Sequence, residues 1–331
     1  NPLRKAQGTL FMKLRITSTG FHVPEYVETS EELSKQVGRS PEWIRSRTGV
    51  SKRHISQQPD VAILGAAAAR QALENSPPPD LLINASGLPR QVLPDNAVFI
   101  ARELGLNGIP CFTVHATCLS FLVGLKVAGS LIGNGFQRIL VVSAELTSIG
   151  RNFDEPESSV LVGDGAAAAL IEPALPDSFS EILFWGMDTW PEGAGFTQVI
   201  GGGTRRHPRM PDVKPEEHLF HMAGPKVYRF ARAKVGDLLD RLYAETGLTC
   251  DDIDLVVPHQ ASGPALGSLP RYGFPDEKVV NIVADYGNCV AASLPMALHH
   301  ALETGRIEPG MNVLLLGTGA GLSVAASVIR W

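Results

Sequence analysis

The sequence has few cysteines, and none of them is spaced like a metal-binding or redox pair. It contains four in 331 residues, at positions 111, 118, 250 and 289, and no two of them form a Cys-x-x-Cys motif. This pattern disfavours a zinc site or a redox-active disulfide. It is typical of a protein in a reducing cytoplasm, which is the location we expect.

Other signals are missing as well. The sequence has no uninterrupted apolar run of about 18 residues, so no membrane span is expected. The net charge is −5 and no long basic run occurs, which argues against nucleic acid as the main partner. The first residues are polar and lack the apolar core of a secretory signal. Met12 is a plausible natural start, so residues 1–11 are interpreted as either a vector remnant or an extension.

The chain has enough apolar sequence for a large core, with 44% apolar and 19% charged residues. Its length suits two packed halves. Strand-like apolar runs alternate with helical segments, which predicts an α/β protein. We expect strands at 81–86, 112–114, 138–143, 166–171, 254–257, 279–283, 313–316 and 324–329, and helices at 61–74, 119–132 and 223–246. A polar connection with Pro173, Pro176 and Asp177 divides an N-terminal half, 12–176, from a C-terminal half, 177–331.

The two halves echo each other. In the first, a strand leads to Cys118, then to an apolar helix and a glycine-bearing stop at 133–135. In the second, the run at 279–283 leads to Asn288, then to a helix through Leu298 and a stop at Gly305. This repeat predicts a duplicated α/β unit whose two buried helices meet centrally, with Cys118 and Asn288 at matching helix starts.

Cys118 is the candidate nucleophile. Free backbone N–H groups and the helix dipole at the start of a helix favour the thiolate, which is the reactive form of cysteine. The alternative is a buried structural cysteine, because an isolated cysteine commonly packs as a small apolar side chain.

Two downstream residues support the first interpretation. His259 follows the strand at 254–257, at the carboxyl end, where α/β sheets place their chemistry. Asn288 follows Gly287 and presents an amide. Each also has a structural interpretation, as a hydrogen-bonded histidine and as a helix cap. The glycine-rich run at 317–321 is followed by a strand-like tail, so it is not a dinucleotide-binding loop.

Together these motifs resemble those of the β-ketoacyl-ACP synthase III family of condensing enzymes, which have the thiolase fold. The resemblance covers residues 12–331. It includes Trp-Ile-x-x-Arg-Thr-Gly at 43–49, Val-Gly-Asp-Gly-Ala at 162–166, His-Leu-Phe-His-Met-Ala-Gly at 218–224, His-Gln-Ala at 259–261 and Gly-Asn at 287–288. It implies a duplicated five-layer α-β-α-β-α architecture and a homodimer.

The resemblance also implies a catalytic triad of Cys118, His259 and Asn288. Cys118 would take an acyl group from an acyl thioester, and the other two would stabilise the enolate of a decarboxylating malonyl-type thioester. The backbone N–H groups of Cys118 and Ala320 would form the oxyanion hole. The implied product is a 3-oxoacyl thioester for fatty acid or secondary-metabolite synthesis.

The implied substrates are acyl-CoA and a malonyl thioester, with acyl carrier protein as an alternative carrier and no metal or cofactor. Trp43, Arg47 and Thr48 would contact coenzyme A. Nearby positive potential is expected from Arg45, Lys52 and Arg53. The basic loop at 201–207 is interpreted either as a lining of the pocket mouth or as a surface loop.

Several positions depart from the family pattern. Ser262 replaces an asparagine, and Pro264 lies where many members have the basic helix start that docks acyl carrier protein. The segment 154–159 lacks an arginine of some coenzyme A sites, and Leu93 lies where a partner-subunit aromatic often closes the acyl pocket. These differences are at least as typical of a specialised homologue as of the enzyme that initiates fatty acid synthesis. The alternative functions are acyl transfer to an alcohol or amine without condensation, which the retained Asn288 disfavours, and a non-catalytic subunit of a heterodimer.

Overall fold

The computed structural model describes residues 12–331, so the interpretation of residues 1–11 lies outside the described chain. Its first large sheet has the strand order β1-β7-β6-β4-β5. β4 is parallel to β5 and β6, while β7 is antiparallel to β1 and β6. The strands are β1 (Leu14–His22), β4 (Leu81–Asn84), β5 (Cys111–Thr113), β6 (Ile139–Leu146) and β7 (Asp164–Pro173). The four strands expected in the first half are confirmed.

The second large sheet has the order β11-β12-β13-β8. β11 and β12 are parallel, and the other neighbours are antiparallel. The strands are β8 (Glu181–Thr189), β11 (Leu255–Pro258), β12 (Asn312–Gly319) and β13 (Ser323–Arg330). The chain passes from one sheet to the other between β7 and β8, where the sequence places the boundary between the halves.

The strand expected at 279–283 is wrong. Val279 makes only an isolated bridge to Val256, and the chain then enters α9 (Val283–Tyr286). The side chain of Gln260 takes the place of a neighbouring strand, because its amide donates to the Val280 carbonyl at 3.0 Å and accepts from the Ile282 N–H at 2.8 Å. The apolar side chains of this run are buried, and its backbone is bonded partly to β11, through the Val280 N–H and the Val256 carbonyl at 2.9 Å, and partly to the Gln260 side chain.

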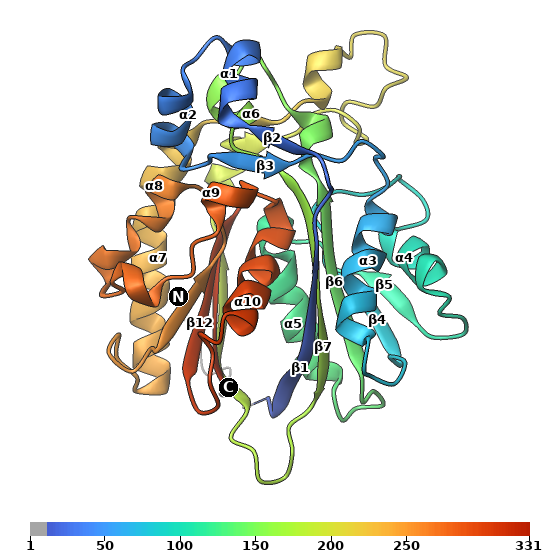
Figure 1. The fold of residues 1–331 in the computed structure, drawn as a ribbon, viewed down its shortest axis with the longest axis vertical. Helices are drawn as coiled ribbons and strands as arrows, with labels where there is room; N and C mark the ends of the chain where they lie inside the picture. The colour runs from blue at the N-terminus through green and yellow to red at the C-terminus, as the bar shows by residue number, and fades with distance from the viewer. Residues whose placement is uncertain (1–11) are drawn as a thin grey trace.

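Helices cover and separate the two sheets, as Figure 1 shows. α3 (Val61–Leu73) and α4 (Asn96–Leu104) cover the outer face of the first sheet, and α7 (Gly224–Thr246) covers the outer face of the second. α5 (Ser120–Leu131) and α10 (Ser293–Glu303) lie between the sheets. The result is the expected five-layer α-β-α-β-α architecture of the thiolase fold.

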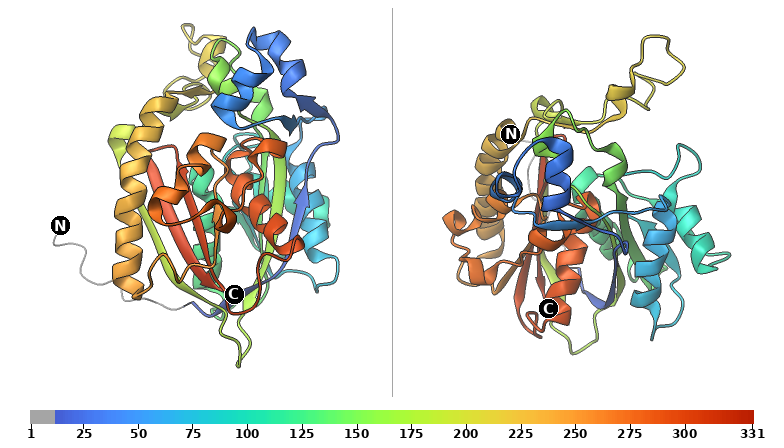
Figure 2. Two further views of the ribbon diagram at one scale, coloured as in Figure 1. Left: turned by 60° about the vertical axis from the view of Figure 1, so that its left-hand side comes forward. Right: turned by 45° about the horizontal axis from the view of Figure 1, so that its top comes forward.

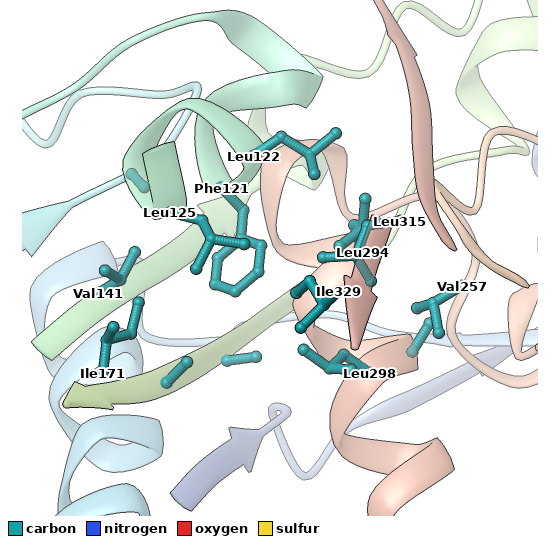
Figure 3. Close-up of a cluster of buried hydrophobic side chains, with 14 of the residues drawn as sticks. Phe121, Leu122, Leu125, Val141, Ile171, Val257, Leu294, Leu298, Leu315 and Ile329 are labelled. Carbon is teal, nitrogen blue, oxygen red and sulfur yellow. The ribbon is translucent and has the colours of Figure 1, made fainter. Parts of the chain in front are cut away.

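The central layer is held by apolar side chains from both halves. Phe121 and Leu125 of α5 and Leu294 of α10 are fully buried in one cluster with residues from both sheets, including Val141 and Leu315 (Figure 3). Both helices are apolar on nearly every side, which is the pattern of a helix buried between layers. Because both helices are packed in this cluster, their first residues are held in fixed positions between the sheets.

Smaller elements form a cap over one end of the sheets (Figure 1). They are β2 (Val27–Thr29), α1 (Ser30–Val37), α2 (Pro41–Thr48), β3 (Lys52–His54), α6 (Pro156–Ser159), β9 (Thr197–Gln198), β10 (His221–Met222) and α8 (Gly263–Leu266). The segment around residues 200–215 projects from this cap (Figure 2). The Ser40 hydroxyl caps α2, and Gly49 ends it with φ +77°.

The internal repeat is confirmed. A short 3₁₀ turn precedes each central helix, η2 (Thr117–Leu119) before α5 and η8 (Val290–Ala292) before α10. Both turns begin with a β-branched residue of positive φ, 51° at Thr117 and 44° at Val290. In both, the first helical serine accepts a hydrogen bond from the backbone four residues earlier, at 2.9 Å for Ser120 and 2.8 Å for Ser293.

The register of the repeat differs from the one expected. The matched turns pair Thr117 with Val290, and therefore Cys118 with Ala291. Asn288 lies three residues earlier, at the position of His115 in the first half. The two polar residues are thus not equivalent members of the repeat, although both lie at its turns.

Candidate active site

Cys118 lies within η2, at the start of α5. Burial, together with a smaller contribution from the neighbouring Glu145 carboxylate, raises the pKa of its thiol to about 12. The backbone groups of Ala320 and Cys118 itself face the thiol and lower its pKa, but by less. The backbone groups at the helix start therefore favour the thiolate, as expected, but burial outweighs them.

The same two backbone groups are those expected to form an oxyanion hole. Ala320 lies in the connection between β12 and β13, and its carbonyl accepts a bond from the Thr117 hydroxyl at 3.4 Å. An added Cβ at Gly319 would lie 2.9 Å from that hydroxyl oxygen. Close packing of the glycine-rich strand end therefore brings Ala320 to η2.

His259 follows the end of β11 and is only 5% exposed. Its backbone N–H donates to the Leu316 carbonyl at 2.8 Å. Burial lowers the pKa of the imidazole to about 4, so the ring is neutral near pH 7. Among residues 12–331, nothing forms a hydrogen bond with its buried Nδ1. The tautomer of the ring is therefore not fixed by a neighbour.

Asn288 has a fixed amide orientation. Its Oδ1 accepts from the Val290 N–H at 2.9 Å and the Ser293 hydroxyl at 3.4 Å. Its Nδ2 donates to the Ala261 carbonyl at 3.3 Å, which leaves a second amide hydrogen for a ligand. Asn288 also caps the turn that precedes α10, so the structural interpretation and the functional one apply to the same side chain.

The three residues are brought together by close packing of their elements. η2 packs against both η8 and β12. An added Cβ at Gly317 would lie 2.8 Å from Leu119 and 3.3 Å from the Cβ of His259, so only glycine lets the nucleophile turn and the histidine approach so closely. Asn288 is joined to the segment that follows His259 through Ala261.

A cavity of about 400 Å³ leads to His259 from the surface between α2, α7 and α8. Its walls are mostly apolar, and its floor includes His259, Gly317 and Thr318. A largely apolar cavity with a few polar groups is typical of a small-molecule site. Cys118 and Asn288 are not among its lining residues.

Two of the three residues expected to contact coenzyme A line this cavity, Arg47 and Thr48. Arg47 is exposed and lies 4.0 Å from Glu157, a loose ion pair that leaves its guanidinium accessible. Trp43 does not line the cavity. It packs against a small apolar cluster one helical turn earlier, with Arg39 5.4 Å from its ring centroid.

The expected positive potential is weaker than the sequence suggests. Arg53 is fully buried and pairs with Glu28 at 3.7 Å, so it contributes nothing to the surface. Arg45 is paired with two glutamates and Lys52 with Asp285. The loop at 201–207 does not line the cavity, and its Arg206 is held by Asp212 and Glu217.

The departures from the family pattern lie at or near the cavity. The Ser262 hydroxyl caps α8 by accepting from the Ala265 N–H at 3.2 Å, and α8 has only four residues. Pro264, which lies where many family members have a basic helix start, lines the cavity. Leu93 is 80% exposed and lies outside the cavity of its own chain, so its contact with a partner subunit stays a prediction.

One further residue was not expected from the sequence. Glu145 of β6 is fully buried, and its carboxylate accepts from the backbone N–H groups of Gly87 and Leu88. It faces Cys118, whose pKa it raises. The sequence does contain a signal for it, because Glu145 is the only charged residue in the otherwise apolar or small strand 139–146.

Within the described chain, no helix is both long and apolar enough to cross a bilayer. In residues 12–331, no group of three or more His, Cys, Asp and Glu side chains is placed to share a metal ion.

The chain is similar to known proteins over nearly its whole length. A family model described as 3-oxoacyl-[acyl-carrier-protein] synthase III matches residues 112–188, and the model of its C-terminal part matches residues 243–331. The beta-ketoacyl-[acyl-carrier-protein] synthase III of Nitratidesulfovibrio vulgaris is 34% identical, covering 94% of this chain and 97% of that one.

Solved structures agree. The 3-oxoacyl-[acyl-carrier-protein] synthase III of Aquifex aeolicus is 28% identical and superposes with a TM-score of 0.87, covering 96% of this chain and all of that one. The priming beta-ketosynthase of a polyketide biosynthetic pathway is 27% identical, with a TM-score of 0.87 and 98% of both chains covered.

Proposed function

The chain belongs to the β-ketoacyl-[acyl-carrier-protein] synthase III family of condensing enzymes, and on this premise we propose that it joins an acyl thioester to a malonyl-type thioester through Cys118. The observation that supports this most is the arrangement around His259, which lines the cavity. The packing of η2 against η8 and β12 brings a thiol and an oriented amide to this neutral imidazole, with two backbone donors facing the sulfur.

In the first step, the Cys118 sulfur attacks the carbonyl carbon of an acyl thioester. The structure favours a neutral thiol and a neutral imidazole, so the proton moves from sulfur to His259 as the sulfur–carbon bond forms. The Cys118 and Ala320 N–H groups hold the oxyanion, and the departing thiolate takes the proton back from His259.

In the second step, a malonyl-type thioester loses CO2, and the electron pair of the broken carbon–carbon bond forms an enolate. His259 and Asn288 donate hydrogen bonds to the enolate oxygen. The enolate carbon attacks the acyl group on Cys118, and the released thiolate regains a proton from water. Because Nδ1 of His259 has no partner in the described chain, Nε2 can accept a proton in one step and donate in the other.

Arg47 and Thr48 are proposed to bind coenzyme A at the cavity mouth, with Trp43 one helical turn earlier on α2. The reaction uses coenzyme A or acyl carrier protein thioesters as substrates and requires no cofactor. A cytoplasmic homodimer, with Leu93 of one subunit at the acyl pocket of the other, remains a proposal from the family. Acyl transfer to an alcohol or amine is disfavoured, because it would leave the free amide hydrogen of Asn288 without a role.

The test is acyl uptake followed by condensation. The protein is incubated with a panel of acyl-CoAs, and intact mass reports an added acyl group; a malonyl thioester is then supplied, and 3-oxoacyl product and CO2 are measured. Cys118→Ala should abolish uptake, while the matched variant Cys111→Ala, at another partly exposed thiol, should retain it. Uptake without product, across all malonyl donors, would instead support simple acyl transfer.

A further inference from the structure

Glu145 is a buried carboxylate that the proposed reaction does not use. It lies near the carboxyl end of β6 and is 0% exposed. Within residues 12–331, no Lys or Arg forms an ion pair with it. A charge buried in this way is costly unless other groups satisfy it, so its partners indicate what it does.

Its partners are backbone groups from both halves of the chain. Gly87 and Leu88, which follow β4, donate their N–H groups, the second at 3.1 Å. The Ala291 backbone, in η8 of the second half, also faces the carboxylate and lowers its pKa. An added Cβ at Gly87 would lie 3.2 Å from Oε1 and 3.0 Å from Val290, so the two halves meet here without room for a side chain.

Each partner leads directly to a residue of the proposed triad. Ala291 follows Val290, whose N–H orients the amide of Asn288. On the other side, the Ser86 carbonyl next to Gly87 accepts from the Ser120 hydroxyl at 3.4 Å, and Ser120 holds the η2 turn that contains Cys118. The Glu145 carboxylate therefore contacts both the segment that supports Cys118 and the turn that orients the amide of Asn288.

We propose that Glu145 is a positioning residue that couples the two halves at the active site, and that the charge on its carboxylate controls the reactivity of the Cys118 thiol. The inference rests on the proposed function only in treating Cys118 as the nucleophile. It adds a group that sets both the geometry and the protonation of the resting site.

Control of the Cys118 thiol by the charge on Glu145 should be visible as a change in reactivity with pH. Burial, with a smaller contribution from Asp164 of β7, raises the pKa of Glu145 to about 8 although the backbone donors oppose it. Cys118 titrates at higher pH, and Glu145 is the charged group that raises its pKa. Glu145 is itself faced by Asp164 and by the buried Cys289, whose pKa is also raised by burial. Glu145 therefore ionises first as the pH rises, and its new negative charge makes the thiolate harder to form.

Alkylation of Cys118 by iodoacetamide measures this without any acyl substrate. In the wild-type protein, the logarithm of the rate should rise linearly with pH, because only the thiolate reacts, and then bend to a smaller slope near pH 8. In Glu145→Gln the line should stay straight, so that above the bend the variant reacts about tenfold faster than wild type. Peptide mapping assigns the label to Cys118, and Cys118→Ala controls for the other thiols.

A matched control is Glu172→Gln, the same substitution in the neighbouring strand β7, at the far end from the site. It should retain the wild-type bend. A straight wild-type profile, or a bend in Glu145→Gln at the same pH, would overturn the proposed control by charge. If Glu145→Gln does not fold, the presence or absence of the bend in the wild-type profile still tests the control of Cys118 by charge.

The positioning role is measured separately. In Glu145→Gln the amide NH2 opposes a backbone N–H of Gly87 or Leu88, so the coupling between the halves is weakened. The rate of condensation should then fall while acyl uptake by Cys118 persists. A condensation rate equal to that of wild type would overturn the positioning role. Absence of acyl uptake in the wild-type protein would contradict the proposed function instead, and the alkylation result would stand on its own.

Discussion

The buried imidazole of His259 should make folding of this protein sensitive to acid. Its pKa is lowered to about 4 by burial, whereas an unfolded chain binds the same proton at about 6.5. Between these two values the unfolded state binds a proton that the folded state excludes. The stabilisation is therefore fully present above about pH 6.5 and is lost as the pH falls toward 4.

The size of the effect follows from the two pKa values. A difference of about 2.5 pH units corresponds to about 3 kcal/mol of unfolding free energy at 25 °C. This is a large fraction of the 5–15 kcal/mol, roughly, that stabilises a typical domain. Because His259 is only 5% exposed, solvent screening removes little of it.

The measurement compares wild type with His259→Gln, whose amide does not titrate. Denaturant unfolding followed by tryptophan fluorescence between about pH 7 and pH 4 gives the unfolding free energy of each protein. The wild-type value should fall by about 3 kcal/mol more than that of the variant. His22 and His299, whose pKa values burial also lowers, are present in both proteins and cancel in the difference. Parallel curves for the two proteins would refute the reasoning.

Three further substitutions test other parts of the structure. Asn288→Ala should leave acyl uptake intact and lower the condensation rate by about 10²–10³-fold, because one enolate donor is lost; equal loss of both activities in a two-step mass and product assay would contradict this. Arg53→Ala should lower the unfolding free energy by about 1–3 kcal/mol, because it leaves the buried Val160 carbonyl without its donor while Glu28 keeps Arg151, whereas Arg45→Ala, at an exposed pair, should leave stability nearly unchanged in the same denaturation assay. Gly49→Ala should cost at least about 1 kcal/mol and weaken coenzyme A binding in a titration, because the residue has φ +77° and its Cβ would lie 2.7 Å from Gly263 at the cavity mouth; unchanged binding and stability would rule out this close contact.

The layers of the fold could be read from the sequence because they depend on local signals. Strands β4, β6 and β7 are short apolar runs bounded by polar residues, and α5 is apolar all round, so burial on every side follows from composition. The run at 279–283 has the same composition and is not a strand. Part of its backbone is bonded to the side chain of Gln260 instead of a strand, and no local pattern shows a contact of that kind.

The candidate site shows the same division. Cys118, His259 and Asn288 were predicted from motifs, because each motif contains the local signal for the end of a strand or the start of a helix beside its residue. The protonation of Cys118 was not, because it depends on burial and on Glu145, which comes from a different strand. Arg53 was interpreted as a surface charge for a similar reason, since only the folded chain shows that Glu28 lies beside it.

The paired turns at Thr117 and Val290 have a consequence for how this fold could be modified. A β-branched residue with positive φ is strained, by about 1–3 kcal/mol in general, and here the strain occurs once in each half. Only the first turn carries a thiol, so the strain belongs to the geometry that starts each buried helix at the centre of the molecule. The second turn uses the same geometry to orient Asn288 through the Val290 N–H, so relieving the strain in either half would disturb a residue of the triad.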